Sequence, residues 1–276
     1  MASPHPALLQ TVSAAIAARA HAVPGLLVAG ICGAQGSGKS TLAKALAADL
    51  AGRGLPAAVL SLDDVYLTRA QRAVLARKVH PLLATRGVPG THDLTLAWQV
   101  ITALERGEPA PLPRFDKLAD DRCPPALWDH APARTRVLLL EGWCIGAVPQ
   151  NGDALVRPVN ALERGEDPDG TWRRYVNHAL TGDYQRLFAR LDLLALLAAP
   201  DFEIVARWRL EQERAAGGTM DRAATERFVA HYERLTRHIL AEMPARADIT
   251  AHLDARRIPL SVAVRERPGA PPQTTG

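Results

Sequence analysis

Residues 33–40 have the types and spacing of a phosphate-binding loop. They read Gly33-Ala34-Gln35-Gly36-Ser37-Gly38-Lys39-Ser40, a complete G-x-x-x-x-G-K-[ST] motif, and Thr41 follows. Glycines let the backbone wrap closely around an anion, and free N–H groups at a helix start attract phosphate. We expect Lys39 to reach the β- and γ-phosphates and the Ser40 hydroxyl to bind Mg²⁺. The motif therefore predicts a nucleotide site, with ATP and Mg²⁺ as its occupants.

Acidic side chains directly follow two further apolar segments. Asp63 and Asp64 come after residues 57–62, and Glu141 comes after residues 136–140. Ligands of open parallel sheets bind beyond the carboxyl ends of the strands, so these carboxylates should lie near the triphosphate. There they can hold Mg²⁺ or accept a proton from an attacking hydroxyl. We predict such roles for Asp63 and Glu141, whereas Asp64 is equally well a helix cap or an arginine partner.

The elements that must position these groups alternate along the chain. Continuous apolar runs predict strands, and helix-forming runs with polar ends predict helices. The strands are expected at 26–32, 57–62, 136–140, 191–197 and 258–264, and the helices at 12–20, 42–51, 69–79, 94–106, 202–216 and 222–242. Asp93 is a plausible N-cap, residues 80–93 and 107–135 read as loops, and residues 150–190 read as broken helix. This alternation predicts an α/β fold with a parallel sheet sandwiched between helices.

Composition limits the class of protein. The chain has 276 residues, 47% of them hydrophobic, which suits one large domain or one domain with an inserted lobe. A net charge of +4 is too weak and dispersed to indicate nucleic acid. No apolar run is long enough for a membrane span, and the three cysteines have no zinc or disulfide spacing. We expect a cytoplasmic protein whose last residues, 268–276, are disordered.

Several segments resemble a known group of kinases. Asp63-Asp64-Val65-Tyr66 resembles the DxFY-type segment of the phosphoribulokinase, uridine kinase and pantothenate kinase superfamily, and Glu141-Gly142 resembles its Walker B pair. Longer segments resemble the D-glycerate 3-kinases of plants and fungi. They are 61–68, 86–93, 112–117, 140–143, 163–177 and 208–213. The resemblance implies a P-loop NTPase fold with helical lid and acceptor-site insertions. It implies one kinase domain over residues 1–267, with acceptor and lid elements at about 80–135 and 150–242.

The resemblance also implies residue roles and an acceptor. It makes Asp63 the catalytic base and, with Ser40 and Glu141, part of the metal site. The implied acceptor is a small hydroxy acid, D-glycerate, and the product is 3-phosphoglycerate. Arg114 and Lys117 offer cations for the carboxylate of such an acceptor.

Other predicted site residues lie in the loops and the lid. The predicted acceptor site adds Asp64, Tyr66, His92 and Asp93. The lid arginines are predicted to be Arg207, beside the transferred phosphoryl group, and Arg214, in the nucleotide site. These two positions are seven residues apart and share a helical face, although charge pairs on a solvated helix explain them equally well.

Two other functions fit the same residues. One is a kinase of the same fold with another acceptor, such as a nucleoside or pantothenate. The other is an ATP-binding regulatory protein without small-molecule kinase activity. The sequence predicts no oligomeric state.

Overall fold

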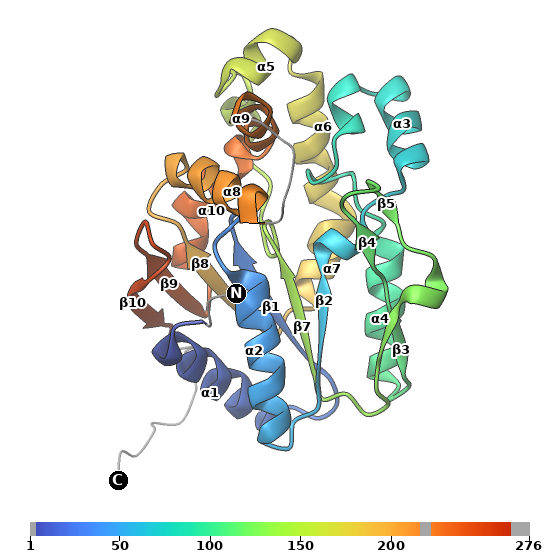
Figure 1. Cartoon of the computed structure of the whole chain (residues 1–276), viewed down its shortest axis with the longest axis vertical. Coiled ribbons are helices and arrows are strands. Elements are labelled where there is room, and N and C mark those ends of the chain that lie inside the picture. The colour runs from blue at the N-terminus through green and yellow to red at the C-terminus, as the bar shows by residue number, and fades with distance from the viewer. Residues whose placement is uncertain (1–3, 216–221, 266–276) are drawn as a thin grey trace.

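A six-stranded sheet with helices on both faces forms the body of the molecule (Figure 1). The computed structural model describes residues 4–215 and 222–265. The helices are α1 (Pro6–Ala22), α2 (Lys39–Gly52), α3 (Arg69–Lys78), α4 (Leu94–Glu105), α5 (Ala161–Glu166), α6 (Thr171–Ala179), α7 (Gln185–Ala189), α8 (Glu203–Ala215), α9 (Arg222–Ala230) and α10 (Glu233–Glu242). The strands are β1 (Leu27–Gly33), β2 (Ala57–Ser61), β3 (Ala110–Leu112), β4 (Phe115–Asp116), β5 (Asp121–Arg122), β6 (Asp129–Ala131), β7 (Val137–Gly142), β8 (Leu193–Ala198), β9 (Ile249–Leu253) and β10 (Pro259–Val264).

The main sheet has the strand order β10-β9-β8-β1-β7-β2. The strands β2, β7, β1, β8 and β9 are parallel to one another, and β10 pairs antiparallel with β9 at one edge. The central strand β1 is buried along its whole length, as are β7 and β8. A parallel strand covered on both faces must be apolar throughout, which explains the continuous apolar runs. The register places the ends of β1, β2 and β7 at one edge of the sheet.

Two apolar cores lie on opposite faces of this sheet. One core joins alternate residues of β1, β7 and β8 to α1, α2 and α8. The other joins the remaining residues of the same strands to α4, α7 and α10. A smaller third cluster, made of Leu82, Leu83, Val88, Leu162 and Trp172, lies beyond the sheet edge where α5 and α6 pack (Figure 1). The α/β architecture predicted from the alternating pattern is therefore confirmed.

Three local predictions were wrong. The strand β9 was missed, because its short run contains Thr250 and His252 and lacks flanking glycine or proline. The helix predicted over 222–242 is two helices, broken near His231 and Tyr232. Residues 107–135 are not wholly irregular, since they contain two antiparallel pairs, β3 with β6 and β4 with β5.

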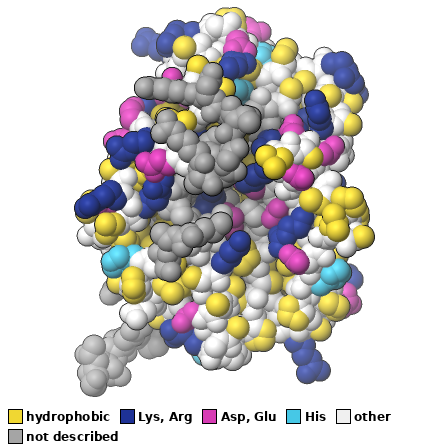
Figure 2. All heavy atoms as spheres, in the orientation of Figure 1, with side chains coloured by type: hydrophobic (Ala, Val, Ile, Leu, Met, Phe, Trp, Pro, Cys, Tyr) yellow, Lys and Arg dark blue, Asp and Glu magenta, His cyan; other side chains and the backbone are white. Residues whose placement is uncertain are grey.

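Two predictions fall outside the described residues, namely those on the tail 268–276 and on the Arg214 side chain. Within the described ranges, no helix combines the length and apolar character needed to cross a bilayer. Basic and acidic side chains are interspersed over the described part of the face in Figure 2, so charge is not gathered there into one broad basic surface.

Candidate active site

The predicted phosphate-binding loop joins β1 to α2. Gly36 and Gly38 adopt positive φ angles of 75° and 91°, which glycine tolerates best. A Cβ on Gly33 would lie 2.6 Å from the Ser37 hydroxyl oxygen, so this position also requires glycine. Helix α2 begins at Lys39, directly after the loop. The N-terminus of α2, with its unpaired N–H groups and positive dipole, therefore faces the space that the loop encloses.

A hydroxyl and a carboxylate meet next to this loop. Ser40 Oγ donates a hydrogen bond of 2.8 Å to Glu141 Oε1, which links the start of α2 to the end of β7. Glu141 is 3% exposed, and its second oxygen, Oε2, is buried without a hydrogen-bond partner among the described residues. An unsatisfied buried carboxylate oxygen is costly, and together with a hydroxyl it is the oxygen ligand set that Mg²⁺ prefers. Ser40 and Glu141 thus fit a magnesium site.

Asp63 lies in a turn of 3₁₀ helix, Leu62–Val65, that follows β2. Tyr66 Oη donates a hydrogen bond of 2.6 Å to Asp63 Oδ1, and Lys117 Nζ lies 2.6 Å from Asp63 Oδ2. Burial alone would raise the pKa of Asp63, but the charges of Lys117 and Lys39 outweigh it and hold that pKa well below its usual value. The Asp63 carboxylate is therefore ionised, oriented and close to the phosphate-binding lysine.

Lys117 reaches Asp63 from the turn between β4 and β5. The charge of Asp63 raises the pKa of the Lys117 ammonium, and Glu141 and Asp64 add to this effect. The structure therefore brings the Lys117 ammonium close to three carboxylates, two that follow β2 and one at the end of β7. The long loop 107–135, which sequence patterns left without regular structure, supplies this cation.

Asp64 is paired with an arginine, as the alternative reading of the sequence allowed. Its Oδ2 accepts from Arg114 Nη1 at 3.1 Å, and its Oδ1 accepts from the Phe115 backbone N–H at 3.1 Å. Arg114 also donates to Asp129 Oδ2 at 2.6 Å. Burial raises the pKa of Asp64 despite these partners. Asp64 and Arg114 thus anchor the start of β4 to the turn that carries Asp63.

His92 and Asp93 lie beside Tyr66 but differ in their surroundings. His92 Nδ1 is 2.6 Å from the hydroxyl oxygen of Tyr184, and its ring stacks at 4.8 Å on Tyr66. Burial lowers the pKa of His92 to about 3, so its ring is neutral at neutral pH. Asp93 accepts from Arg122 Nη2 at 3.1 Å. Asp93 is the N-cap residue of α4, as predicted, although its side chain makes no capping hydrogen bond to that helix.

Of the two predicted lid arginines only Arg207 has a described side chain, and its contacts are with residues other than these carboxylates. Arg207 Nη2 donates to the Ala255 carbonyl at 3.2 Å, and Arg207 Nε lies 4.0 Å from Glu211. The Arg209 guanidinium lies 5.3 Å from the centre of the Phe228 ring. In this structure Arg207 therefore contacts the turn between β9 and β10.

Sequence reasoning missed several residues that shape the site. Tyr184 orients His92, Arg122 holds Asp93, and Trp143 donates from Nε1 to the Gly87 carbonyl at 2.8 Å. These residues come from positions far apart in the chain, and none belongs to a spaced motif. Trp143 follows the Glu141-Gly142 pair directly, and that adjacency was the one available signal.

Comparisons with known proteins show which family and which relatives this chain resembles. Residues 28–150 match the Phosphoribulokinase / Uridine kinase family. The chain is 36% identical over 219 residues to "Uncharacterized kinase mug58" of Schizosaccharomyces pombe, across 74% of this chain and 78% of that protein. It is 30% identical over 257 residues to "D-glycerate 3-kinase, chloroplastic" of Arabidopsis thaliana, across 85% of this chain and 54% of the plant protein. This chain therefore spans about half the length of that plant relative.

A solved structure shares the fold. The D-glycerate 3-kinase from Cryptococcus neoformans superposes with a TM-score of 0.79 at 23% sequence identity, covering 95% of this chain and all of that one. At this identity the match establishes a common arrangement of helices and strands.

Proposed function

Since the chain belongs to the phosphoribulokinase and uridine kinase family and is a kinase, we propose that it transfers the γ-phosphoryl group of ATP to D-glycerate, forming 3-phosphoglycerate. The observation that carries this proposal is the contact between Lys117 Nζ and Asp63 Oδ2 at 2.6 Å. A base with a cation beside it suits an acceptor whose hydroxyl lies close to an anionic group. The names of the plant and Cryptococcus relatives supply D-glycerate as such an acceptor.

The phosphate-binding loop and its neighbours hold the nucleotide in this proposal. Backbone N–H groups of residues 33–41 and the Lys39 ammonium bind the phosphates. Ser40 and Glu141 would hold Mg²⁺, which neutralises developing charge on the phosphates when bound. Glu141 Oε2, buried without a partner among the described residues, supports this assignment.

In this proposal Asp63 orients the acceptor hydroxyl, takes its proton and, together with Ser40 and Glu141, assists the metal site. The low pKa of Asp63 makes it a weak base. Phosphoryl transfer passes through a loose transition state in which little bonding to the nucleophile has formed, so orientation matters more than basicity. Tyr66 supports that orientation through its hydrogen bond to Asp63 Oδ1.

The acceptor carboxylate binds Lys117 and Arg114 in this proposal. Lys117 then exchanges part of its contact with Asp63 for the substrate anion, which leaves Asp63 free to meet the hydroxyl. Asp64 holds Arg114 in place through the 3.1 Å contact, and the neutral His92 ring and Asp93 line the same side. Arg207 and Arg214 of α8 are proposed to close over the γ-phosphate, which requires Arg207 to leave Ala255.

We further propose that residues 1–267 form a single kinase domain. A continuous sheet supports this division, because one set of hydrogen-bonded strands runs from β2 at one edge to β10 at the other. The loops and helices at about 80–135 and 150–242 supply the acceptor side and the lid.

The test is ADP release from Mg²⁺·ATP with and without D-glycerate, with the product identified by mass and phosphate position. Strong stimulation with formation of 3-phosphoglycerate is the expected result. L-Glycerate, uridine and pantothenate serve as matched acceptors, and the Lys39→Ala variant is the control for contaminating kinases. Stimulation by uridine or pantothenate alone would identify that compound, in place of D-glycerate, as the acceptor. No stimulation by any acceptor would reject small-molecule kinase activity.

A further inference from the structure

We propose that Arg257, in the turn between β9 and β10, is a positioning residue for the phosphate-binding loop and sets its affinity for triphosphate. Arg257 Nε donates a hydrogen bond of 2.6 Å to the carbonyl oxygen of Gly36, in the middle of that loop. The two residues are 221 positions apart, so only the fold brings them together. The inference rests on nucleotide binding in the proposed function and is independent of the acceptor.

Arg257 is fixed by contacts on several sides. Its Nη2 donates to Glu211 Oε2 at 2.7 Å, and its guanidinium lies 5.1 Å from the centre of the Trp208 ring. Glu211 and Trp208 both belong to α8. A planar guanidinium that is bonded at one nitrogen, paired at another and stacked on an indole has little freedom. Arg257 therefore connects the phosphate-binding loop to α8 through defined geometry.

The backbone at Arg257 is itself unusual. Its φ angle is +68°, in the left-handed region that costs a non-glycine residue free energy. The turn closes through Arg257 N–H donating to the Asp254 carbonyl at 3.0 Å and Asp254 N–H donating to the Ile258 carbonyl at 2.8 Å. A residue held in a strained conformation by its surroundings is a common feature of sites where side-chain direction matters. Here the left-handed backbone conformation of Arg257 accompanies the contact of its guanidinium with Gly36.

Trp208 completes the contact between the loop, the turn and α8. It is fully buried, and its Nε1 donates to the Ala255 carbonyl at 2.9 Å. A Cβ on Gly36 would lie 2.7 Å from the Trp208 Cβ, so the loop backbone packs directly on the helix. The outer side of the loop therefore rests on Trp208 and Arg257.

The contact with Gly36 acts on one peptide unit of the loop. The carbonyl of that unit accepts from Arg257, and its N–H, on Ser37, donates to the Ala34 carbonyl at 3.1 Å. Both polar ends of the peptide are thus satisfied, which fixes its plane. The following residues, Gly38 to Ser40, form the start of α2, and in the proposed function their N–H groups bind the phosphates. A loop that is already in its binding conformation loses less entropy when triphosphate binds.

The experiment measures calorimetric dissociation constants of the full chain for Mg²⁺·ATP and for magnesium tripolyphosphate. We compare the wild type with Arg257→Gln and Arg257→Gly. Glycine adopts positive φ without strain, so Arg257→Gly removes the guanidinium and keeps the turn. Both variants should bind both ligands about tenfold more weakly, a change of about 1.4 kcal/mol, with an unchanged melting temperature for Arg257→Gly. Arg256→Ala is the matched control, because Arg256 is 83% exposed and pairs only loosely with Asp254 at 3.8 Å.

Three outcomes would overturn the inference. Unchanged affinity in both Arg257 variants would show that the loop keeps its geometry without the guanidinium. A loss confined to ATP, with tripolyphosphate unaffected, would mean that Arg257 contacts the nucleoside instead of the loop. If the wild type bound neither ligand, the proposed function would fall together with this inference, whereas the first two outcomes leave the proposed function standing.

Discussion

At the scale of single residues, contacts at its two carboxylate oxygens set the charge and the orientation of Asp63. The β4–β5 turn brings Lys117 to one carboxylate oxygen, and the turn after β2 brings Tyr66 to the other. The first contact stabilises the ionised form and the second fixes its orientation. The ionised state of the proposed base, Asp63, therefore depends on Lys117, a loop residue that shares no sequence motif with it.

Replacing Asp63 by asparagine should abolish turnover and spare nucleotide binding. The amide keeps the size of the carboxylate and cannot accept the acceptor proton, so kcat should fall by about 10²- to 10⁴-fold. The dissociation constant for Mg²⁺·ATP, measured by calorimetry, should stay close to that of the wild type. Full activity in Asp63→Asn would remove Asp63 from the role of base.

Replacing Lys117 by methionine should shift the acid limb of the pH profile of kcat/KM to higher pH. The ammonium favours the charged form of Asp63, so without it burial dominates and the pKa of Asp63 rises. In the wild type the depressed pKa keeps Asp63 ionised down to low pH. The midpoint of kcat/KM on the acid side should therefore lie at higher pH in Lys117→Met, measured with D-glycerate.

The exposed Lys78→Met variant is the control for the loss of one positive charge. An acid limb that stays in place in Lys117→Met would mean that Lys117 does not govern the ionisation of Asp63 in solution.

At the scale of elements, the loop between α3 and α4 is held by two aromatic side chains, one directly after β7 and one between α9 and α10. Trp143 Nε1 donates to the Gly87 carbonyl, and the Tyr232 hydroxyl donates to the Arg86 carbonyl at 2.9 Å. The Trp143 and Tyr232 rings meet edge to face at 4.9 Å. This loop leads directly to His92, so its docking places one side of the proposed acceptor site.

Replacing Gly87 by alanine should destabilise the protein strongly. Gly87 has φ +122°, and an added Cβ would lie 1.9 Å from the Tyr232 hydroxyl oxygen. Backbone strain and overpacking together should lower the free energy of unfolding by at least about 2 kcal/mol, read from urea denaturation. Gly107→Ala is the matched control, because Gly107 has φ +73° and no neighbour near its Cβ. Equal losses in the two variants would contradict the packing argument.

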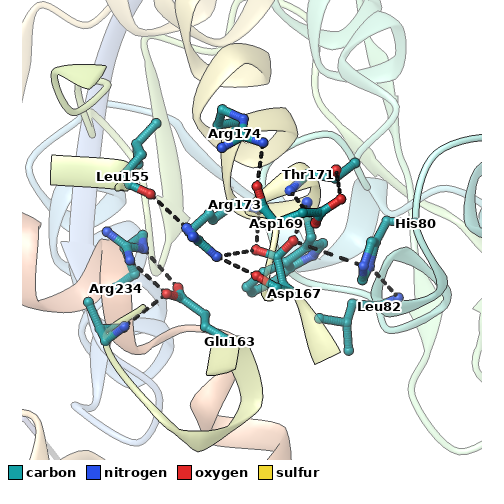
Figure 3. Close-up of polar contacts among 12 residues, drawn as sticks. His80, Leu82, Leu155, Glu163, Asp167, Asp169, Thr171, Arg173, Arg174 and Arg234 are labelled. Carbon is teal, nitrogen blue, oxygen red and sulfur yellow. Dashed lines mark hydrogen bonds and ion pairs between the residues drawn. The ribbon is translucent and has the colours of Figure 1, made fainter. Parts of the chain in front are cut away.

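At the scale of the whole molecule, buried ion pairs tie the small cluster beyond the sheet edge to the rest of the fold. Arg234 of α10 bonds both oxygens of Glu163 of α5, with distances of 2.7 and 2.6 Å, and Arg173 of α6 bonds Asp167 at 2.9 Å (Figure 3). Glu163 is 1% exposed and Arg234 is 9% exposed. The Arg234–Glu163 pair joins segments 71 residues apart, so it connects the proposed acceptor side to the helix that packs on the sheet, whereas Arg173 and Asp167 are only six residues apart.

Removing one partner of the Arg234–Glu163 pair should lower the free energy of unfolding more than removing both partners. Arg234→Met leaves the buried Glu163 carboxylate unpaired and should lower the free energy of unfolding by about 3–5 kcal/mol. Adding Glu163→Leu removes that charge, so the double variant should be more stable than Arg234→Met alone. Urea unfolding of the four proteins in this cycle gives the coupling energy.

The exposed pair of Arg186 with Asp183 is the control for this cycle. Both side chains are more than 70% exposed, so Arg186→Met should cost less than about 1 kcal/mol. A double variant less stable than Arg234→Met would show that Glu163 is not the charge that Arg234 satisfies.

Local sequence patterns were sufficient to predict the phosphate-binding loop motif, the parallel α/β sheet and the positions of Asp63 and Glu141 at the ends of strands. These features can be predicted because glycine spacing, apolar runs and helix starts each depend on residues that are adjacent in the chain. The resemblance to a kinase family, also read from consecutive segments, was confirmed by the comparisons.

Contacts between side chains that are distant in the chain follow from the tertiary fold and could not be predicted from local patterns. Lys117 reaches Asp63 across 54 positions, Tyr184 reaches His92 across 92, and Arg257 reaches Gly36 across 221. The strand β9 was missed for a similar reason, because the sheet beside it, and not its short mixed sequence, makes it a strand. Burial and pairing between distant segments are properties of the folded chain, and no local pattern encodes them.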